Sequence, residues 1–271
     1  MRSLSNNQKP LILVVNDDGL ESAGFKAAVR AAGKCGEVLA IAPARQQTAM
    51  GRAYPRYPDL GIIEERKLDL GDCVINAYAV HSSPAHAVCY GALEIARRKP
   101  DLVVSGINHG ANLGTSVTGS GTVGACLEAA CEGMPSIALS LETGADWIME
   151  ADREPEMRYA EAAGYFWINR TLAQGMPEGC DILNVNVPAG PVDPEEYRIT
   201  FLEKQSYYVL RKPPDRDRSK PYTIEFEIEI DTDTLSPGSD IHTVCVEHVI
   251  SVTPLTWDIT ARKGRTECVD L

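Results

Sequence analysis

The stretch LILVVNDDGLESAGF, residues 11–25, joins five consecutive apolar residues to the polar turn Asn16–Gly19. An apolar run of this length is typical of a buried strand in a parallel sheet. At its end, the adjacent carboxylates of Asp17 and Asp18 repel each other and lose hydration. A cap on the helix that begins near Ser22 would account for Asp18 alone. The pair therefore predicts a site where positive charge is supplied.

Short apolar runs alternate with helix-like segments over most of the chain. Strands are expected at Leu11–Val15, Val38–Ala42, Val74–Val80, Leu102–Ser105, Ile137–Leu141 and Ile182–Val187. Between them, apolar residues three and four apart predict helices at Ala23–Ala32, Ala85–Arg98, Gly121–Glu132 and Glu156–Ala173. This alternation predicts an α/β fold, a Rossmann-like three-layer core in which helices cover both faces of a mainly parallel sheet.

The pattern changes after Pro188. Residues Tyr222–Ile230 alternate between apolar and polar side chains, which predicts a half-exposed antiparallel strand. Its partner is expected at Ser206–Lys212, across the polar loop Pro213–Pro221, so that the two form a projecting β-hairpin arm. The sequence leaves open whether this arm packs on its own subunit or contacts another. A last strand is expected at His248–Pro254, before a weakly patterned tail.

Composition limits the classes of partner. The 271 residues include 38 acidic and 26 basic side chains, which gives a formal net charge of -12. A field of that sign repels nucleic acid and anionic membranes, so neither is expected as a partner. No apolar run approaches the roughly 18 residues of a membrane span, and the polar start MRSLSNNQKP lacks the core of a signal peptide. Eight cysteines without a CxxC pair predict buried free thiols in a reduced cytoplasm.

Three polar loops follow predicted strands and are expected to converge. The first is the turn with Asp17 and Asp18, the second is APARQQTAMG at residues 42–51, and the third runs from Gly106 to Gly124. The carboxyl ends of parallel strands lie along one edge of the sheet, where open α/β folds bind ligands. Mg²⁺ or Mn²⁺ takes oxygen ligands and would remove the repulsion between the two aspartates. The scattered histidines and cysteines do not fit a zinc site.

The third loop ends in Gly119–Gly124, which fits the pattern GxGxxG, and Glu142 follows further on, as in a dinucleotide-binding fingerprint. In that fingerprint the glycines follow a strand directly, whereas irregular residues separate them from the expected strand in this chain. Free amides at the start of the helix, with the hydroxyls of Ser120 and Thr122, would hold a phosphate. An ordinary helix cap and a dinucleotide site remain as alternatives.

Taken together, the three loops resemble the SurE survival-protein family, whose members are metal-dependent 5'-nucleotidases acting on nucleoside monophosphates. The first motif of that family, N-D-D-G, appears in VVNDDGLESAG. The second, A-P-x-R-x-x-S-G, corresponds to APARQQTA at residues 42–49, where Thr48 stands in place of the usual serine. The third, V-S-G-I-N-x-G-x-N-L-G followed by S-G-T-V, matches Val104–Gly114 and Ser120–Val123. The segment SPGSDIHTVCVEHVISVTPLTWDITA is also similar, so the resemblance extends from about residue 11 to 261.

The resemblance implies a set of site residues, position by position. Those that match the metal ligands of the family, for one Mg²⁺ or Mn²⁺ per subunit, are Asp17, Asp18, Thr48 and Asn108. Those that match its phosphate site are Asn16, Asn112, Ser120, Gly121 and Thr122. It also implies one domain over residues 9–271, with a core at about 9–190 and 240–257, an arm at about 197–235 and a tail at 258–271. Arm and tail are expected to be exchanged between subunits of a homodimer or homotetramer.

Four positions depart from the family pattern. Ala44 replaces an aspartate and Ala49 a glycine in the second loop, and Gly119 replaces a larger residue beside the phosphate site. In the segment Ser82–Val88, which corresponds to G-T-P-x-D-C-V, His86 stands at the aspartate position. No implied metal ligand is lost. Hydrolysis is therefore expected, and the substrate preference is what these changes affect.

The expected reaction is hydrolysis of a nucleoside 5'-monophosphate, or of another small phosphomonoester, by a metal-activated water, with Asp17 or Asp18 orienting that water. Three alternatives remain. A phosphatase with an aspartyl nucleophile needs D-x-D after the first strand, and Asn16 and Gly19 interrupt both registers. A dinucleotide-dependent oxidoreductase would use Gly119–Gly124. A nucleotide-binding module would keep the same pocket without turnover.

Overall fold

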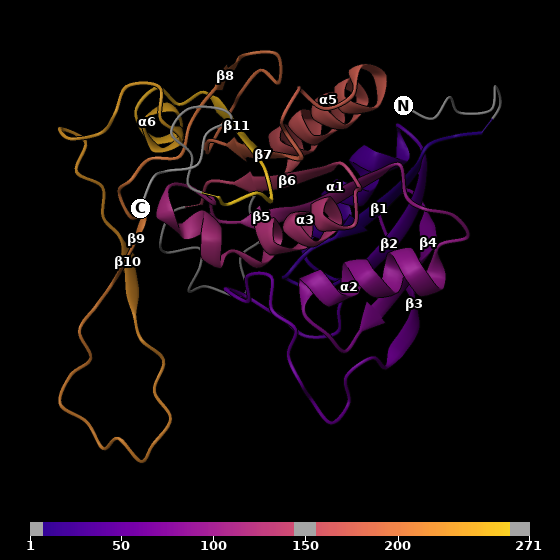
Figure 1. Cartoon of the computed structure of the whole chain (residues 1–271), viewed down its shortest axis with the longest axis horizontal. Helices are drawn as coiled ribbons and strands as arrows, with labels where there is room; N and C mark the ends of the chain where they lie inside the picture. Colours follow the sequence, from indigo (N-terminus) through magenta and orange to yellow (C-terminus); the bar gives the residue numbers. More distant parts are fainter. Residues whose placement is uncertain (1–7, 144–155, 261–271) are drawn as a thin grey trace.

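The computed structural model describes residues 8–143 and 156–260. Its centre is a nine-stranded sheet with the strand order β3-β4-β2-β1-β5-β6-β7-β11-β8 (Figure 1). The strands from β4 to β7 in this order are parallel to one another. At the two ends of this parallel part, β3 runs antiparallel to β4, and β11 runs antiparallel to β7. The bounds are β1 Leu11–Val15, β2 Glu37–Pro43, β3 Ile63–Asp69, β4 Val74–Val80, β5 Leu102–His109, β6 Ser136–Leu141, β7 Ile182–Val187, β8 Tyr197–Ile199 and β11 Ile250–Leu255.

Helices cover both faces of the sheet. On one face α1 (Ala23–Gly33) packs against α5 (Arg158–Gln174), and on the other α2 (Pro84–Tyr90) packs against α3 (Gly121–Cys131). Alternate residues of β1 join the two cores, as expected of a strand that is buried on both faces. The predicted α/β fold with a mainly parallel sheet is confirmed.

Two elements differ from the sequence prediction. The edge strand β3 is not predicted, because the charged residues Glu64–Lys67 break the apolar alternation; charged side chains at a sheet edge face solvent and discourage further pairing. The helix predicted over Ala85–Arg98 is wrong at its end. α2 stops at Tyr90, a π-helical turn follows at Gly91–Ile95, and the chain is extended at Ala96, where it turns toward β5.

The C-terminal part contributes a second, two-stranded sheet. β9 (Tyr208–Leu210) and β10 (Phe226–Ile228) pair antiparallel, which confirms the predicted hairpin with shorter strands than the alternation suggests. In Figure 1 the loop that joins them projects away from the large sheet. β8, which lies within the range predicted for the arm, instead joins the large sheet beside β11. Residues 261–271 of the predicted tail lie outside the described residues.

The described cysteines are free, as predicted. All seven lack a disulfide, but only Cys126 and Cys180 are buried as predicted. Cys35, Cys89 and Cys245 are half-buried, and Cys73 and Cys131 are exposed. Cys268 lies outside the described residues. In the part of the chain that the structure describes, no helix has the length and apolar character to cross a membrane.

Candidate metal and phosphate site

The turn after β1 is built by its asparagine. Asn16 Nδ2 donates to the Gly19 carbonyl (2.9 Å) and to Ser22 Oγ (3.0 Å), while Asn16 Oδ1 accepts from the Gly19 amide (3.2 Å). Ser22 caps α1 by accepting from the Phe25 amide (3.2 Å), so the cap is not Asp18. Gly19 has a φ of +94°, which a glycine adopts without strain. Neither carboxylate is therefore needed to start the helix.

Asp17 meets the first turn of α3. Its Oδ1 accepts from the Thr122 hydroxyl (2.9 Å), and a Cβ on Gly121 would lie only 2.7 Å from Asp17 Oδ2. Burial and the charge of Asp18 raise the pKa of Asp17 to about 7, although hydrogen bonds from Thr122 oppose the shift. Asp17 is thus a buried acid without a counter-charge of its own.

Asp18 is the second carboxylate of the pair. Its Oδ2 is buried and has no hydrogen-bond partner among the described residues, and its Oδ1 is 3.5 Å from Gln46 Nε2. Burial raises the pKa of Asp18, even though the ring and the backbone of His109 favour the ionised form. A buried oxygen without a partner costs free energy unless an ion or a water reaches it.

The second loop is held at both ends. The Gln47 amide donates to the Asp17 carbonyl (2.7 Å), and the Gly51 amide donates to the Gly119 carbonyl (3.0 Å). Thr48 lies between these two anchors. The structure therefore places this predicted ligand in a segment that is fixed between the end of β1 and the start of α3.

Asn108 lies at an irregularity in the sheet, where the register between β5 and β6 shifts after Ser105. Its Nδ2 donates to the carbonyls of Gly110 (2.7 Å) and His109 (3.3 Å). With the amide nitrogen used in this way, the amide oxygen is left as an acceptor. An oxygen of this kind is a ligand that a hard cation prefers.

Asn112 is fixed by side chains that the sequence analysis does not single out. Its backbone amide donates to Asn186 Oδ1 (2.8 Å), and its backbone carbonyl accepts from Nδ2 of Asn184 (2.9 Å) and Asn186 (3.1 Å). Its own side chain donates to Ser140 Oγ (2.8 Å). All four residues are buried. The sequence offered one signal for these partners, namely two asparagines inside the apolar run Ile182–Val187. Side-chain amides that are buried in a strand need hydrogen-bond partners.

The predicted phosphate residues Ser120, Gly121 and Thr122 form the start of α3. Ser120 Oγ accepts from the Val123 amide (3.1 Å), so the residue is also an ordinary cap. The remaining first-turn amides have no partner within the helix, and they lie beside Asp17. Such a helix start is suited to binding an anion.

The surroundings of the glycines differ from those of a dinucleotide site. A 3₁₀ turn at Thr115–Gly119 precedes α3, where the fingerprint requires a strand. Glu142, the acid expected to bind the ribose in that reading, accepts instead from the Ala189 amide (3.0 Å). The geometry therefore favours the phosphate interpretation.

The third loop is also tied to the C-terminal part of the chain. Asp240, the first residue of α6 (Asp240–Cys245), is fully buried. Its Oδ2 accepts from the Gly114 amide (2.8 Å), and its Oδ1 accepts from the Glu203 amide (2.9 Å). Residues far apart in sequence thus hold the loop that carries Asn112.

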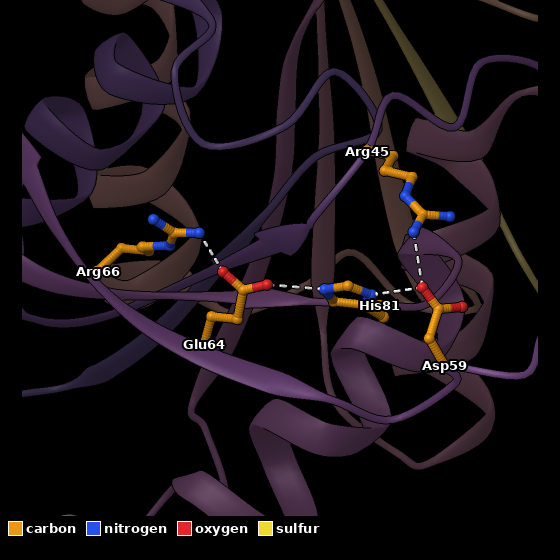
Figure 2. Close-up of polar contacts among 5 residues, drawn as sticks. All are labelled: Arg45, Asp59, Glu64, Arg66 and His81. Carbon is orange, nitrogen blue, oxygen red and sulfur yellow. Dashed lines mark hydrogen bonds and ion pairs between the residues drawn. The ribbon is translucent and has the colours of Figure 1, made fainter.

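A chain of alternating charges lies near the neighbouring strand ends (Figure 2). His81, directly after β4, contacts Asp59 through Nδ1 (2.7 Å) and Glu64 through Nε2 (2.8 Å). Arg45 pairs with Asp59 (2.6 Å), and Arg66 pairs with Glu64. The bonds to His81 lower the pKa of both carboxyls and raise the pKa of His81. A cavity of about 120 Å³ beside this His81 charge chain is lined by Arg45, Gln47, Tyr57, Asp59, His81 and Ser82.

The four departures from the family pattern have different settings. Ala49, in place of glycine, has a φ of +58°, a left-handed conformation that strains an alanine. Gly119 borders open space, since a Cβ there would meet no atom within 4 Å. His86 packs edge-on against Tyr54 with ring centroids 4.1 Å apart, as expected of a packing histidine. Ala44 is half-buried against the core.

Residues 12–209 match the model of the family described as Survival protein SurE. The chain belongs to the SurE family. It is 39% identical over 262 residues to the 5'-nucleotidase SurE of Methanocella arvoryzae, an alignment that covers 94% of this chain and 95% of the relative. The 5'-nucleotidase SurE of Methanothermobacter thermautotrophicus is 41% identical over 214 residues, covering 78% and 80%.

A solved structure supports the same family. The crystal structure of the SurE protein from Aquifex aeolicus matches with a TM-score of 0.71 and 29% sequence identity, covering 93% of this chain and 95% of that one. The resemblance read from the three loops is therefore confirmed at the level of family and fold.

The oxygen donors at this edge of the SurE fold suit a hard divalent cation. A bound ion would satisfy the unpartnered Asp18 Oδ2 and remove the repulsion that raises the pKa of Asp17. Within residues 8–143 and 156–260, no three His, Cys, Asp or Glu side chains gather to hold a metal. Amide or hydroxyl oxygens are therefore needed to complete the set, and the residues fit Mg²⁺ or Mn²⁺ better than zinc.

Proposed function

We propose that this chain is a divalent-metal-dependent 5'-nucleotidase that releases phosphate from nucleoside 5'-monophosphates. The observation that carries the proposal is the pair Asp17 and Asp18, two acids with raised pKa values in the turn after β1, one of them bonded to the first turn of α3 and the other with an unpartnered oxygen. Two relatives over most of the chain, both 5'-nucleotidases of the SurE family, support the same reaction.

The residues that would hold the metal are Asp17, Asp18, Thr48 and Asn108. When bound, Mg²⁺ or Mn²⁺ supplies Lewis-acid polarisation of a phosphoryl oxygen and neutralises developing charge. Asp17 would also orient the attacking water, since its carboxylate lies beside the helix start where the phosphoryl group is expected.

The remaining phosphoryl oxygens would be bound by Ser120, Gly121, Thr122 and Asn112. The amides at the start of α3 favour negative charge, and they are fixed before substrate arrives, which is how such donors stabilise a transition state. Asn16 would act through the turn that it closes, because its side chain positions the two aspartates.

A panel of nucleoside 5'-monophosphates tests the proposal. Phosphate release is measured with Mg²⁺ or Mn²⁺, with EDTA, and with EDTA followed by excess metal. We expect release that EDTA abolishes and metal restores. Release that is unchanged by EDTA would contradict a metal-dependent reaction.

A nucleotide-binding module without turnover is the second candidate. Ala44 in place of an aspartate and the open space beside Gly119 favour it. The same panel separates the two functions, because the module would bind a nucleoside monophosphate saturably in equilibrium dialysis and release no phosphate.

Exposed apolar side chains in the C-terminal part support an oligomer. Ile199, Phe201, Leu210, Ile224 and Phe226 are between 37% and 66% exposed. Of these, Leu210 and Phe226 are paired across the arm, and adjacent exposed apolar side chains are typical of contacts between proteins. We infer a homodimer or homotetramer in which the arm at about 197–235 and the tail at 258–271 contact another subunit. Sedimentation as a monomer at micromolar concentration would contradict this arrangement.

The compartment that fits the unpaired thiols is a reduced cytoplasm. Labelling of the native protein with a thiol reagent tests this expectation. Rapid labelling of the exposed Cys73 and Cys131 in protein purified without reductant is the expected result.

A further inference from the structure

An ion pair with a buried carboxylate joins the second loop to helix α3. Arg52 Nε lies 2.6 Å from Glu128 Oε2, and the Glu128 side chain is only 2% exposed, whereas that of Arg52 is 42% exposed. Glu128 lies on the helix whose first turn carries the predicted phosphate residues. Arg52 directly follows Gly51, the downstream anchor of the segment that contains Thr48. The pair therefore connects two parts of the candidate site.

Glu128 is ionised in spite of its burial. Burial opposes ionisation, but hydrogen bonds from Tyr54, Arg52 and Cys89 outweigh it and lower the pKa of Glu128. One of these is the bond from Cys89 Sγ to Glu128 Oε1 (3.4 Å). Burial of the Glu128 carboxylate costs hydration free energy, so an ion pair of this kind contributes little to stability compared with an apolar pair of the same volume. Its placement is thus better explained by the geometry that it fixes.

The ion pair closes a junction where two backbones touch. A Cβ on Gly124 would lie 2.1 Å from the Gly51 carbonyl oxygen and 2.7 Å from the Arg52 amide nitrogen, so only glycine permits this approach. The Gly51 amide also donates to the Gly119 carbonyl (3.0 Å). The loop is thus seated against α3 and its entry by contacts with Gly119, Gly124 and Glu128.

We propose that Arg52 and Glu128 are positioning residues that hold Thr48 in place for the metal. The upstream end of the segment is fixed by the bond from the Gln47 amide to the Asp17 carbonyl (2.7 Å). The downstream end is fixed by the bond from the Gly51 amide to the Gly119 carbonyl and, one residue further on, by the ion pair of Arg52 with Glu128. Because Thr48 itself is exposed, its position relative to Asp17 depends on both ends. The inference rests on the proposed function, in which these two residues share a metal ion.

Mn²⁺ binding by three variants tests the proposal. Arg52→Ala removes the pair, and Glu128→Gln removes it without leaving a buried charge, because Arg52 reaches solvent. Arg30→Ala is the matched control. Its pair with Glu161 also joins Nε to Oε2 (2.8 Å), but it links α1 to α5 on the other face of the sheet. The dissociation constant is obtained from the electron paramagnetic resonance signal of free Mn²⁺, with thermal melts and steady-state kinetics beside it.

We expect Arg52→Ala and Glu128→Gln to weaken Mn²⁺ binding about tenfold, while kcat at saturating Mn²⁺ stays within about threefold of the wild type. Arg52→Lys should regain part of the loss. Arg30→Ala should lower the melting temperature without changing Mn²⁺ binding. Unchanged Mn²⁺ binding in folded Glu128→Gln would overturn the proposal, as would equal weakening in Arg30→Ala. If the wild-type protein binds no Mn²⁺, the proposed function fails first, and this inference fails with it.

Discussion

Two pairs of carboxylates near the same edge of the sheet have opposite surroundings. After β1, burial raises the pKa values of Asp17 and Asp18, and the charge of Asp18 adds to the shift of Asp17. After β4, two strands away, His81 bonds to both Asp59 and Glu64, and the pKa values of these two carboxyls are lowered. Among the described residues, the carboxylates after β1 thus lack an ion-pair partner, whereas after β4 each carboxylate is paired with an arginine and with His81.

The difference indicates where the chain relies on something from solution. Arginines and His81 neutralise the carboxylates of Asp59 and Glu64, so these two acids need no ligand from solution. Within the part of the chain that the structure describes, the pair after β1 receives uncharged hydrogen bonds from Thr122 and Gln46, together with the ring and the backbone of His109. A cation bound from solution would give Asp17 and Asp18 the positive partner that Asp59 and Glu64 already have. The following predictions test that comparison.

Replacing Asp17 by asparagine should have the largest effect. We expect metal-dependent phosphate release to fall roughly 10³-fold or more, because a metal ligand and the water-orienting group are lost together. Without metal, the variant should melt at a higher temperature than the wild type, since one of two buried charges is gone. A phosphate-release assay and thermal melts measure both. Near-normal turnover in the folded variant would rule out the role given to Asp17.

The stability of the metal-free protein should fall as the pH rises. The pKa of Asp17 is raised from its ordinary value of 3.8 to about 7 in the folded state, so the folded chain keeps a proton that the unfolded chain has released. This contribution therefore declines from about pH 4 and is fully lost above about pH 7. Mn²⁺ should raise the melting temperature most above pH 7.

Melts at pH 5, 6, 7 and 8, each with Mn²⁺ and with EDTA, measure this dependence. Asp17→Asn is the control, because it lacks the titrating group and should show a smaller decline with pH. A gain from Mn²⁺ that is the same at every pH would contradict a competition between Mn²⁺ and the proton on Asp17.

The stability contributed by the His81 charge chain should change at a higher pH than that contributed by Asp17. It should not depend on metal. Bonds to Glu64 and Asp59 raise the pKa of His81, so the stability that it contributes is complete below 6.5 and declines as the pH passes its raised pKa. His81→Gln should lower the melting temperature by roughly 2 °C at pH 6 and by less at pH 8. A difference that widens with pH would contradict a charged His81.

Arg66→Ala should have the smallest effect. Arg66 and Glu64 are both solvent-accessible, and exposed ion pairs contribute little because water screens them. We expect a shift of less than about 1 °C in the melting temperature and no change in Mn²⁺ binding. A larger loss would mean that the outer end of the chain supports His81 more strongly than its exposure suggests.

Much of the fold and part of the site were predictable from local patterns. The parallel sheet follows from uninterrupted apolar runs, because strands buried on both faces carry few polar residues. Asp17 and Asp18 could be singled out because adjacent carboxylates at a strand end have no local explanation. Their convergence with the second and third loops follows from the geometry of parallel strands.

What the sequence did not reveal depends on the order of the strands and on single buried polar groups. Asn184 and Asn186 support Asn112 only because β7 lies next to β6 in the sheet. Glu128 lies in a helix of otherwise apolar or small residues, and nothing local pairs it with Arg52, 76 positions earlier. β3 was not predicted because its charged side chains suit an edge that only the full sheet defines.

The bonds of Asp240 have a consequence for how this protein can be shortened or rearranged. Its two carboxylate oxygens serve the amides of Gly114 and Glu203 at once. A truncation before Asp240 would leave both donors without an acceptor, one of them in the loop that carries Asn112. The segment that begins at Asp240 is therefore no detachable appendage. Variants truncated before it, or circular permutants opened between β7 and α6, should lose order in a loop encoded more than a hundred codons upstream.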